Sequence, residues 1–220
     1  MPPPPAIDTT SQTTIAGTKE PPAVTRAPEN LPAVEDLKPI FVETGLASWY
    51  GAPYNKRKAS DGSVYDMHAM TAAHRTLPLG SIVRVTNLKT GKAATVKITD
   101  RGPFVEGRVI DLSLAAAKAT DVWAAGTAKV RLEVLKAPAS LEHGGRWAVQ
   151  IGAFDKEKAA DKLVDHLTRK YHTAKVLSFS SPVGDWWVRV RVQDDDRNRA
   201  EEVARDTHTQ EGSIFLVRLD

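Results

Sequence analysis

The sequence contains no cysteine among its 220 residues. This absence excludes disulfide bonds, thiolate metal sites, a cysteine nucleophile and, within this chain, a lipidated cysteine. The six histidines are scattered rather than placed at ligand spacing, so we expect no metal site and no cofactor. The sequence has neither a phosphate-binding glycine loop nor a serine in a nucleophile elbow, which argues against nucleotide chemistry and acyl transfer.

A strong excess of one charge is also lacking. The 30 basic and 27 acidic residues are interspersed and give a formal net charge of +3, too small to indicate a nucleic-acid partner. No apolar run approaches the roughly 20 residues that span a bilayer, and the N-terminus lacks the basic-then-apolar pattern of a signal peptide. Either an export signal lies outside this sequence or the protein stays inside the cell.

Proline is concentrated at the N-terminus. Nine of the 14 prolines precede Phe41, in a stretch with few large apolar residues. Such a composition does not support a packed core. We therefore interpret residues 1–40 as a disordered, Pro-rich leader that acts as an extended tether.

Short alternating runs separated by Gly, Pro, Asn and Asp follow the leader and predict an all-β domain over residues 41–136. The expected strands are residues 46–50, 81–86, 94–99 and 128–135. Ser113 is a suitable N-cap for a short alanine-rich helix over residues 114–119. Residues 137–145, which contain Pro138 and two glycines, are expected to be a linker.

Residues 146–220 show a different pattern. Helical periodicity over residues 155–171 and 198–209 alternates with expected strands at 147–152, 174–179, 186–192 and 214–219. The order βαββαβ predicts a four-stranded sheet with both helices packed on one face and the other face open. The whole chain is thus predicted to hold two domains of different class, an all-β barrel and an α+β domain.

Five polar segments carry the candidate chemistry. They are Ala47-Ser-Trp-Tyr-Gly, Ala59-Ser-Asp-Gly-Ser-Val-Tyr-Asp66, Thr71-Ala-Ala-His74, Thr99-Asp-Arg-Gly-Pro-Phe104 and Val109-Ile-Asp-Leu-Ser113. In this order and spacing they resemble the double-psi β-barrel domain of the rare lipoprotein A family, septal-ring lytic transglycosylases that cut peptidoglycan glycan strands. The C-terminal domain is similar to a SPOR domain, the module with which that family binds glycan lacking stem peptides.

The resemblance implies a reaction in which the 6-hydroxyl of N-acetylmuramic acid attacks its own ring to give a 1,6-anhydro product. An internal nucleophile removes the need for a second carboxylate to activate water, so one acid/base suffices. Asp100 matches the catalytic Asp of the family, and His74 matches its active-site histidine, expected to orient the carboxyl or a sugar hydroxyl. Without the resemblance, a turn-stabilising Asp and a packed histidine are the favoured interpretations.

Other residues of the barrel domain are assigned to glycan binding. Trp49 and Tyr50 either stack on sugar rings or are buried in the barrel, and Arg101 adjoins Asp100. Asp111 either faces the same groove or contributes to capping the short helix.

One position departs from the family pattern. The family has Glu directly after the glycine of the Asp61-Gly62 turn, whereas this chain has Ser63, which offers neither a carboxyl proton nor a charge. Three hypotheses follow: Asp100 works alone, Asp61 substitutes for the glutamate, or catalysis is lost and glycan binding remains.

In the C-terminal domain, strand alternation places Trp187, Arg189 and Arg191 on the face opposite the valines. The same alternation turns Gln150 away from its apolar neighbours. An exposed Trp beside amide and guanidinium donors suits a carbohydrate, and similar SPOR domains bind glycan across this sheet. A solvated polar face is the alternative. The basic-aromatic fingerprint of RNA-binding sheets is missing.

The resemblance of both domains implies an endolytic peptidoglycan transglycosylase that cleaves MurNAc-GlcNAc bonds of glycan strands lacking stem peptides and is targeted to the septum by its SPOR domain. The alternatives are a non-catalytic glycan-binding wall protein and, thirdly, wall loosening without bond cleavage. Peptidoglycan is the expected partner, with septal-ring proteins as further candidates and no nucleic acid. Because the substrate lies in the periplasm of a Gram-negative cell, we expect export through a signal that this sequence does not contain.

Overall fold

The computed structural model describes residues 37–209 and 212–220. Residues 1–36 of the expected leader lie outside the described residues, so its disorder stays a prediction. Within the described ranges, no helix is long and apolar enough to cross a membrane.

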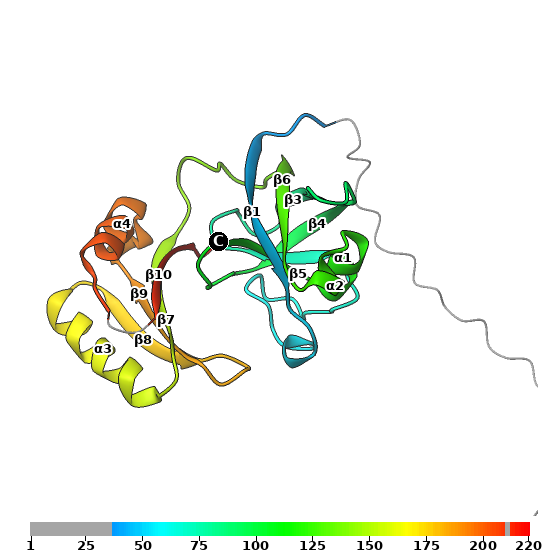
Figure 1. Ribbon diagram of the computed structural model, residues 1–220. Helices are drawn as coiled ribbons and strands as arrows, with labels where there is room; N and C mark the ends of the chain where they lie inside the picture. The colour runs from blue at the N-terminus through cyan, green and yellow to red at the C-terminus, as the bar shows by residue number, and fades with distance from the viewer. Residues whose placement is uncertain (1–36, 210–211) are drawn as a thin grey trace, which may run out of the picture. The chain divides into compact units, whose positions relative to one another are not determined.

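Six strands of the N-terminal domain form a closed barrel (Figure 1). They are β1 (Phe41–Trp49), β2 (Thr71–His74), β3 (Ile82–Asn87), β4 (Ala93–Asp100), β5 (Arg108–Leu112) and β6 (Ala128–Lys136). Their order around the barrel is β1-β5-β2-β4-β3-β6. The pairs β1–β5 and β2–β4 are parallel, and the remaining pairs are antiparallel. The predicted double-psi barrel fold agrees with this closed arrangement of six strands.

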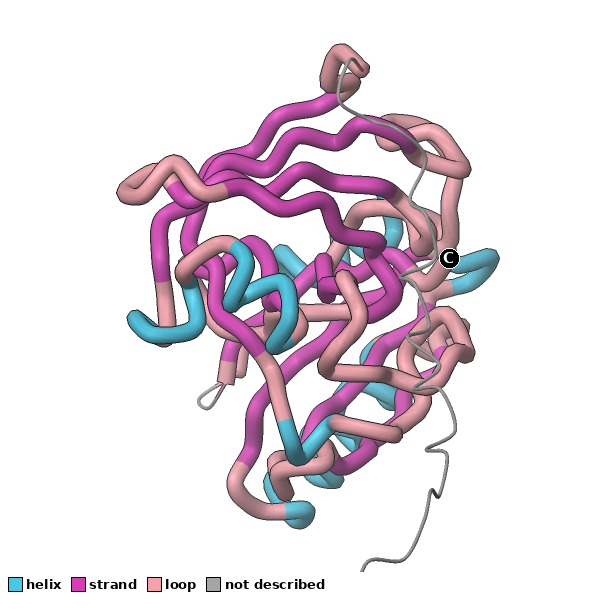
Figure 2. The backbone as a smooth tube through the Cα atoms, turned by 90° about the vertical axis from the view of Figure 1, so that its right-hand side faces the viewer, coloured by secondary structure: helices cyan, strands magenta, loops and turns pink. Residues whose placement is uncertain are grey.

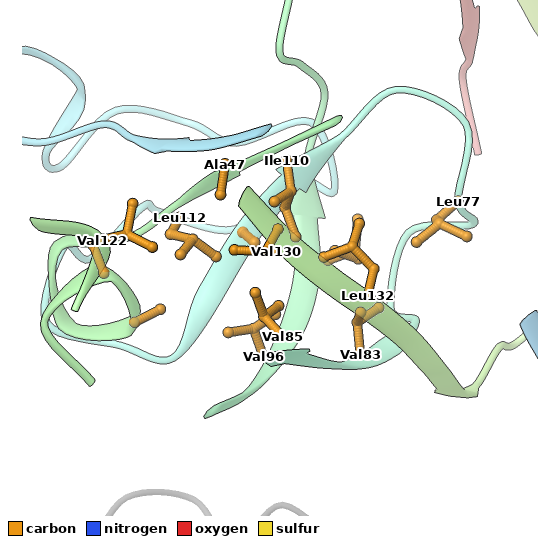
Figure 3. Close-up of a cluster of buried hydrophobic side chains, with 14 of the residues drawn as sticks. Ala47, Leu77, Val83, Val85, Val96, Ile110, Leu112, Val122, Val130 and Leu132 are labelled. Atoms are coloured by element: carbon orange, nitrogen blue, oxygen red, sulfur yellow. The ribbon is translucent and has the colours of Figure 1, made fainter. Parts of the chain in front are cut away.

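Alternation of apolar and polar residues determines which side chains enter the barrel. In β3, Val83 and Val85 are fully buried, whereas Arg84 between them is partly exposed. The core consists of aliphatic side chains from all six strands, from Leu77 in the loop after β2 and from the segment after β5, and Figure 3 shows part of this cluster. Burial of each such side chain contributes about 1.5–3 kcal/mol, which makes this cluster the main source of barrel stability.

Three short helical elements accompany the barrel, namely η1 (Ala52–Tyr54), α1 (Leu114–Ala119) and α2 (Val122–Ala125). The predicted helix over residues 114–119 is confirmed, with Ser113 at its N-cap. The Ser113 Oγ accepts a hydrogen bond from the backbone N–H of Ala116 at 3.1 Å and donates one to the carbonyl of Ala69 at 2.7 Å. The cap therefore ties the helix start to the loop before β2.

The C-terminal domain is a four-stranded antiparallel sheet with the order β10-β7-β9-β8. Its elements are β7 (Trp147–Phe154), α3 (Glu157–Lys170), β8 (Lys175–Ser180), β9 (Trp186–Arg191), η2 (Gln193–Asp195), α4 (Arg197–Asp206) and β10 (Ser213–Arg218). Both α3 and α4 cover the same face of the sheet (Figure 1). The predicted βαββαβ plan is confirmed.

Two barrel strands, β2 and β5, were not among the strands that we predicted. Both are short; β2 ends at His74, and β5 contains Asp111 one residue before its end. Figure 2, in which strands are magenta, shows that strands make up most of the regular structure and that loops join many of them.

Candidate active site

Two carboxylates lie on strands β4 and β5 of the barrel wall, which are separated by β2. Asp100 ends β4 and Asp111 lies in β5, and both pair with Ala73 of the intervening β2. Residues paired across neighbouring strands point to the same face of a sheet, so all three side chains face the same way. Ile98 and Ile110 point into the barrel core, and an irregularity of the pairing between Ala72 and Ala73 turns Asp100 to the face opposite that of Ile98, two residues before it. The carboxylates therefore lie on the outer surface of the wall, on either side of a small alanine.

Asp100 is held by its own loop and by the loop before β2. Its Oδ1 accepts hydrogen bonds from the Ser60 backbone N–H at 3.1 Å, the Ser60 hydroxyl at 2.5 Å and the Arg101 backbone N–H at 2.8 Å. The backbone N–H of Asp61 also donates to the Thr99 carbonyl at 3.0 Å, which fixes this loop against β4. Among the described residues no donor is recorded for Oδ2. One carboxylate oxygen is thus positioned by the protein, and the other is available to a ligand.

Asp111 is more deeply placed, with a side chain 14% exposed. Its Oδ2 accepts a hydrogen bond from Arg108 Nη2 at 2.8 Å. Burial raises the pKa of Asp111 to about 6, and the positive charges of Arg108 and Arg75 oppose that rise. The group therefore titrates close to neutral pH, unlike an ordinary surface carboxyl.

Both carboxylates line a groove of about 780 Å³. Aromatic residues of the barrel line it as well, namely Trp49, Tyr50, Tyr54, Tyr65 and Phe104. The ring of Tyr50 stacks on that of Tyr65, with 4.4 Å between centroids, and meets the ring of Tyr54 edge-on at 5.9 Å. The predicted Trp49 and Tyr50 are thus at the groove. Tyr54 and Tyr65 were missed, although the spacing Tyr50-Gly-Ala-Pro-Tyr54 pointed to an aromatic cluster.

His74 does not line this groove. Its neighbour Ala73 faces the groove, so alternation turns the imidazole to the other side of β2, where it is 4% exposed. Nδ1 accepts hydrogen bonds from the backbone N–H groups of Thr76 and Leu77 at 3.1 Å, and Nε2 lies 3.1 Å from Glu43 Oε2. Burial lowers the pKa of His74. We had expected this side chain to orient the reacting carboxyl or a sugar hydroxyl, and the structure instead places it in the support of the barrel.

Arg101 is also largely engaged by the protein. Its Nη1 donates to the carbonyls of His74 at 3.0 Å and Leu77 at 2.7 Å, and its Nη2 donates to the Asp220 carbonyl at 2.6 Å. Burial lowers the pKa of Arg101 to about 10. Gly102 follows with a φ of 145°, a region where residues with a side chain are strained. Arg101 lines the groove, but its guanidinium chiefly clamps the chain after β2.

The Asp61-Gly62-Ser63 turn does not reach the groove. Neither Asp61 nor Ser63 lines it, and both are exposed. Asp61 Oδ1 accepts hydrogen bonds from the Ser63 backbone N–H at 2.9 Å and the Ser63 hydroxyl at 2.5 Å, closing a local turn. The geometry therefore gives no support to Asp61 as a replacement for the family glutamate.

The sheet face opposite the helices carries the residues that we predicted for glycan binding. Gln150 pairs with Arg189, and Gly152 with Trp187, while Val188 and Val190 lie fully buried beneath the helices. The alternation is confirmed, but the prediction of an open face is wrong. Trp187 is 7% exposed and Gln150 only 2%.

Aromatic packing explains the burial of this face. Phe179 and Phe215 of the same sheet pack with Trp187, and the Phe104 ring lies 5.3 Å from that of Trp187. Arg189 donates to Gln150 Oε1 from Nε at 3.2 Å and from Nη2 at 2.6 Å. Burial lowers the pKa of Arg189.

Three of the four predicted residues of this sheet line the groove, namely Gln150, Trp187 and Arg189. Arg191 does not. Its guanidinium is paired with Asp195 at 2.9 and 2.5 Å. The prediction that Arg191 binds glycan therefore has no support from its position.

No group of three or more His, Cys, Asp or Glu side chains in the described ranges could hold a metal ion. The arrangement at the groove is instead a carboxylate with one oxygen available, a second carboxyl that titrates near neutrality, and a set of aromatic rings. Aromatic faces pack well against the apolar faces of sugars, and positioned carboxyls transfer protons to and from glycosidic oxygens.

Two family profiles match the chain in succession. The lytic transglycolase family matches residues 42–132, and the SPOR domain matches residues 143–214. Together with the closed six-stranded barrel and the four-stranded sheet, they define a protein with a double-psi β-barrel of the lytic transglycolase type followed by a SPOR domain.

Relatives of known name agree with this class. Proteins named "Endolytic peptidoglycan transglycosylase RlpA" are similar to the chain in three bacteria. The Vibrio cholerae protein is 55% identical over 95 residues, covering 43% of this chain and 36% of the relative. The Campylobacter jejuni protein is 41% identical over 158 residues, covering 61% of this chain and 56% of the relative. The Pseudomonas aeruginosa protein is 41% identical over 138 residues, covering 63% of this chain and 40% of the relative. The chain is similar to the rare lipoprotein A family in both of its domains, as the polar segments predicted. It spans from about a third to just over half of the length of these relatives.

Proposed function

We propose that the protein is an endolytic peptidoglycan transglycosylase that cleaves the bond between N-acetylmuramic acid and N-acetylglucosamine. The observation that carries this proposal is Asp100. One of its oxygens is fixed by three donors, and the residue lies in a groove lined by aromatic rings. The names of the relatives and the lytic transglycolase match support the same activity.

In the proposed reaction a single carboxyl transfers both protons. Protonated Asp100 donates its proton to the glycosidic oxygen as the bond from that oxygen to C1 breaks. The 6-hydroxyl oxygen of the same muramic acid residue then bonds to C1, and the Asp100 carboxylate takes the proton of that hydroxyl. No water is consumed, and Asp100 returns to its starting form. The Tyr50 ring, which stacks on the buried Tyr65, supports the sugar beside it.

The proposed substrate is glycan that lacks stem peptides, bound with the help of the SPOR domain. Trp187 and Arg189 line the groove together with Asp100, so residues from both domains are available to one strand. We further propose export to the periplasm and action at the division septum, where septal-ring proteins are candidate partners. Fractionation of cells that express the natural gene tests the location, and a purely cytosolic protein would refute it.

Product analysis tests the activity. Wild type, Asp100→Asn and Asp61→Asn are incubated with peptide-free glycan strands, and soluble products are identified by mass spectrometry. Asp61 is the matched control, because it is an acidic residue of the neighbouring loop that does not line the groove. We expect 1,6-anhydro products from wild type and Asp61→Asn and none from Asp100→Asn.

A second candidate function is glycan binding without cleavage. The observation that favours it is Ser63, which lies outside the groove and leaves no carboxyl from that turn near Asp100. Strand binding without product release by all three proteins would establish this alternative and refute the enzymatic proposal.

A further inference from the structure

The groove contains a second carboxyl, Asp111, which has no role in the reaction proposed above. Its Oδ2 is paired with Arg108, but its Oδ1 is buried and makes no hydrogen bond with any group in the part of the chain that the structure describes. A buried acceptor without a partner costs roughly 1–3 kcal/mol, and such groups in folded proteins generally have a partner or a function.

An unpaired donor lies beside this unpaired acceptor. Arg108 donates from Nη2 to Asp111, whereas its Nε is buried and has no partner among the described residues. Both side chains line the groove. A hydroxyl group donates one hydrogen bond and accepts others, so it can satisfy both atoms at once. Neither a carboxylate nor an ammonium group can do this, because the first only accepts and the second only donates.

The position of Asp111 relative to Asp100 suits a neighbouring part of the same ligand. Both residues pair with Ala73, so their side chains emerge from the same face with only a methyl group between them. Two strand spacings separate their backbones, roughly 9–10 Å. This is about the width of a pyranose ring with its substituents on either side.

Resting on the proposed function, we infer that Asp111 and Arg108 form a subsite that binds a sugar hydroxyl of the glycan held over Ala73. Asp111 Oδ1 accepts the hydrogen bond of that hydroxyl, and Arg108 Nε donates to its oxygen. Asp111 is thus a substrate-contacting carboxyl that is distinct from Asp100.

The subsite makes glycan affinity depend on pH. The charged and titratable groups that influence Asp111 are Arg108 on its own strand, Arg75 after β2, and Tyr50 and Tyr54 near the end of β1. The two tyrosines have raised pKa values, because of burial first, and stay neutral at the relevant pH. With a pKa of about 6, Asp111 is mostly ionised at pH 7.5 and mostly protonated at pH 5. A donated hydrogen bond favours the ionised form, so the glycan binds more tightly at the higher pH.

Binding rather than turnover is measured, so that the test does not depend on cleavage. The dissociation constant for peptide-free glycan fragments is determined by calorimetry at pH 5 and pH 7.5, using Asp100→Asn to prevent turnover. We expect binding to be about fivefold weaker at pH 5, which is the effect of a fall of about one unit in the pKa of Asp111 on binding. In Asp100→Asn/Asp111→Asn we expect weaker binding with no such dependence. In Asp100→Asn/Asp61→Asn the dependence should remain.

Carbon NMR of the aspartate carboxyls in Asp100→Asn, where Asp111 is intact and turnover is prevented, covers the case in which the double variant fails to fold. We expect the Asp111 signal to shift when glycan binds and its titration midpoint to fall. Two results would overturn the inference. One is an unchanged pH dependence of binding in Asp100→Asn/Asp111→Asn, and the other is an Asp111 signal that does not shift on addition of glycan while other signals do. If the wild type forms no anhydro products but the pH dependence of binding is as expected, the proposed cleavage is refuted and the inferred subsite is not.

Discussion

Asp100 and Asp111 lie on opposite sides of Ala73, each one strand away from it on the outer face of the barrel wall. Two strand spacings, roughly 9–10 Å, separate their backbones, so the two carboxyls are not a closely spaced dyad. They are therefore placed to act on different atoms of one ligand.

The first prediction concerns the serine that holds Asp100. Ser60→Ala removes the hydroxyl that donates to Asp100 Oδ1, while two backbone donors remain. Because a hydrogen bond to a charged group contributes roughly 1.5–3 kcal/mol, we expect kcat for anhydro-product release to fall by about 10- to 100-fold. Ser63→Ala is the control, since that hydroxyl binds Asp61 outside the groove. Equal rates for Ser60→Ala and wild type would contradict the assigned contact.

The second prediction concerns the His74–Glu43 pair. Burial lowers the pKa of His74 below its ordinary 6.5, and the hydrogen bond from His74 lowers the pKa of Glu43 below 4.5. At these sites the unfolded chain binds more protons than the folded one. The pair therefore stabilises the fold fully above pH 6.5, and its contribution is lost as the pH falls, first through His74 and then through Glu43.

Urea unfolding at pH 7.5 and pH 5 measures this effect. Asp111 has a raised pKa and works in the opposite direction, so the test is the difference between variants and not the wild-type slope alone. We expect His74→Gln to lower the free energy of unfolding at pH 7.5 by about 1–3 kcal/mol and by less at pH 5. His143→Gln, at an exposed histidine, should leave both values unchanged. An equal loss at the two pH values would show that His74 is not held neutral.

The third prediction separates two arginines of β9. Arg189 lines the groove and binds Gln150, whereas Arg191 is paired with Asp195 away from it. We expect Arg189→Ala to weaken binding of peptide-free strands by about tenfold, because it removes a partly buried donor. Arg191→Ala should change binding less than about twofold. Co-sedimentation with strands measures both, and a larger effect of Arg191→Ala would show that the sheet binds glycan elsewhere.

Local patterns were sufficient to predict much of the fold. Alternation in β3 and in β9, helical periodicity in α3 and the N-cap at Ser113 all depend on nearby residues, and each predicted the observed element. Strands β2 and β5 depend on partners far along the chain. Their sequences are only four and five residues long and carry little period-2 signal of their own, so they were missed as strands.

The site was predicted less completely, for the same reason. Asp100, Trp49 and Tyr50 line the groove, but the direction of His74 depends on the register of β2 against β5, which sequence does not show. The burial of Trp187 was missed in the same way. Its partner Phe104 lies far along the chain in the barrel domain, so the contact could not be predicted from the sequence around Trp187. Burial caused by distant residues is not visible in local alternation.

The central claim is that a hydroxyl of the substrate, and not water, attacks at the groove. Peptide-free strands are digested in ¹⁸O-labelled water, and the new chain ends are examined by mass spectrometry. The account predicts 1,6-anhydro ends, lighter by one water than hydrolysed ends and free of ¹⁸O, that disappear in Asp100→Asn. Reducing ends labelled with ¹⁸O, or anhydro ends that persist in Asp100→Asn, would contradict it.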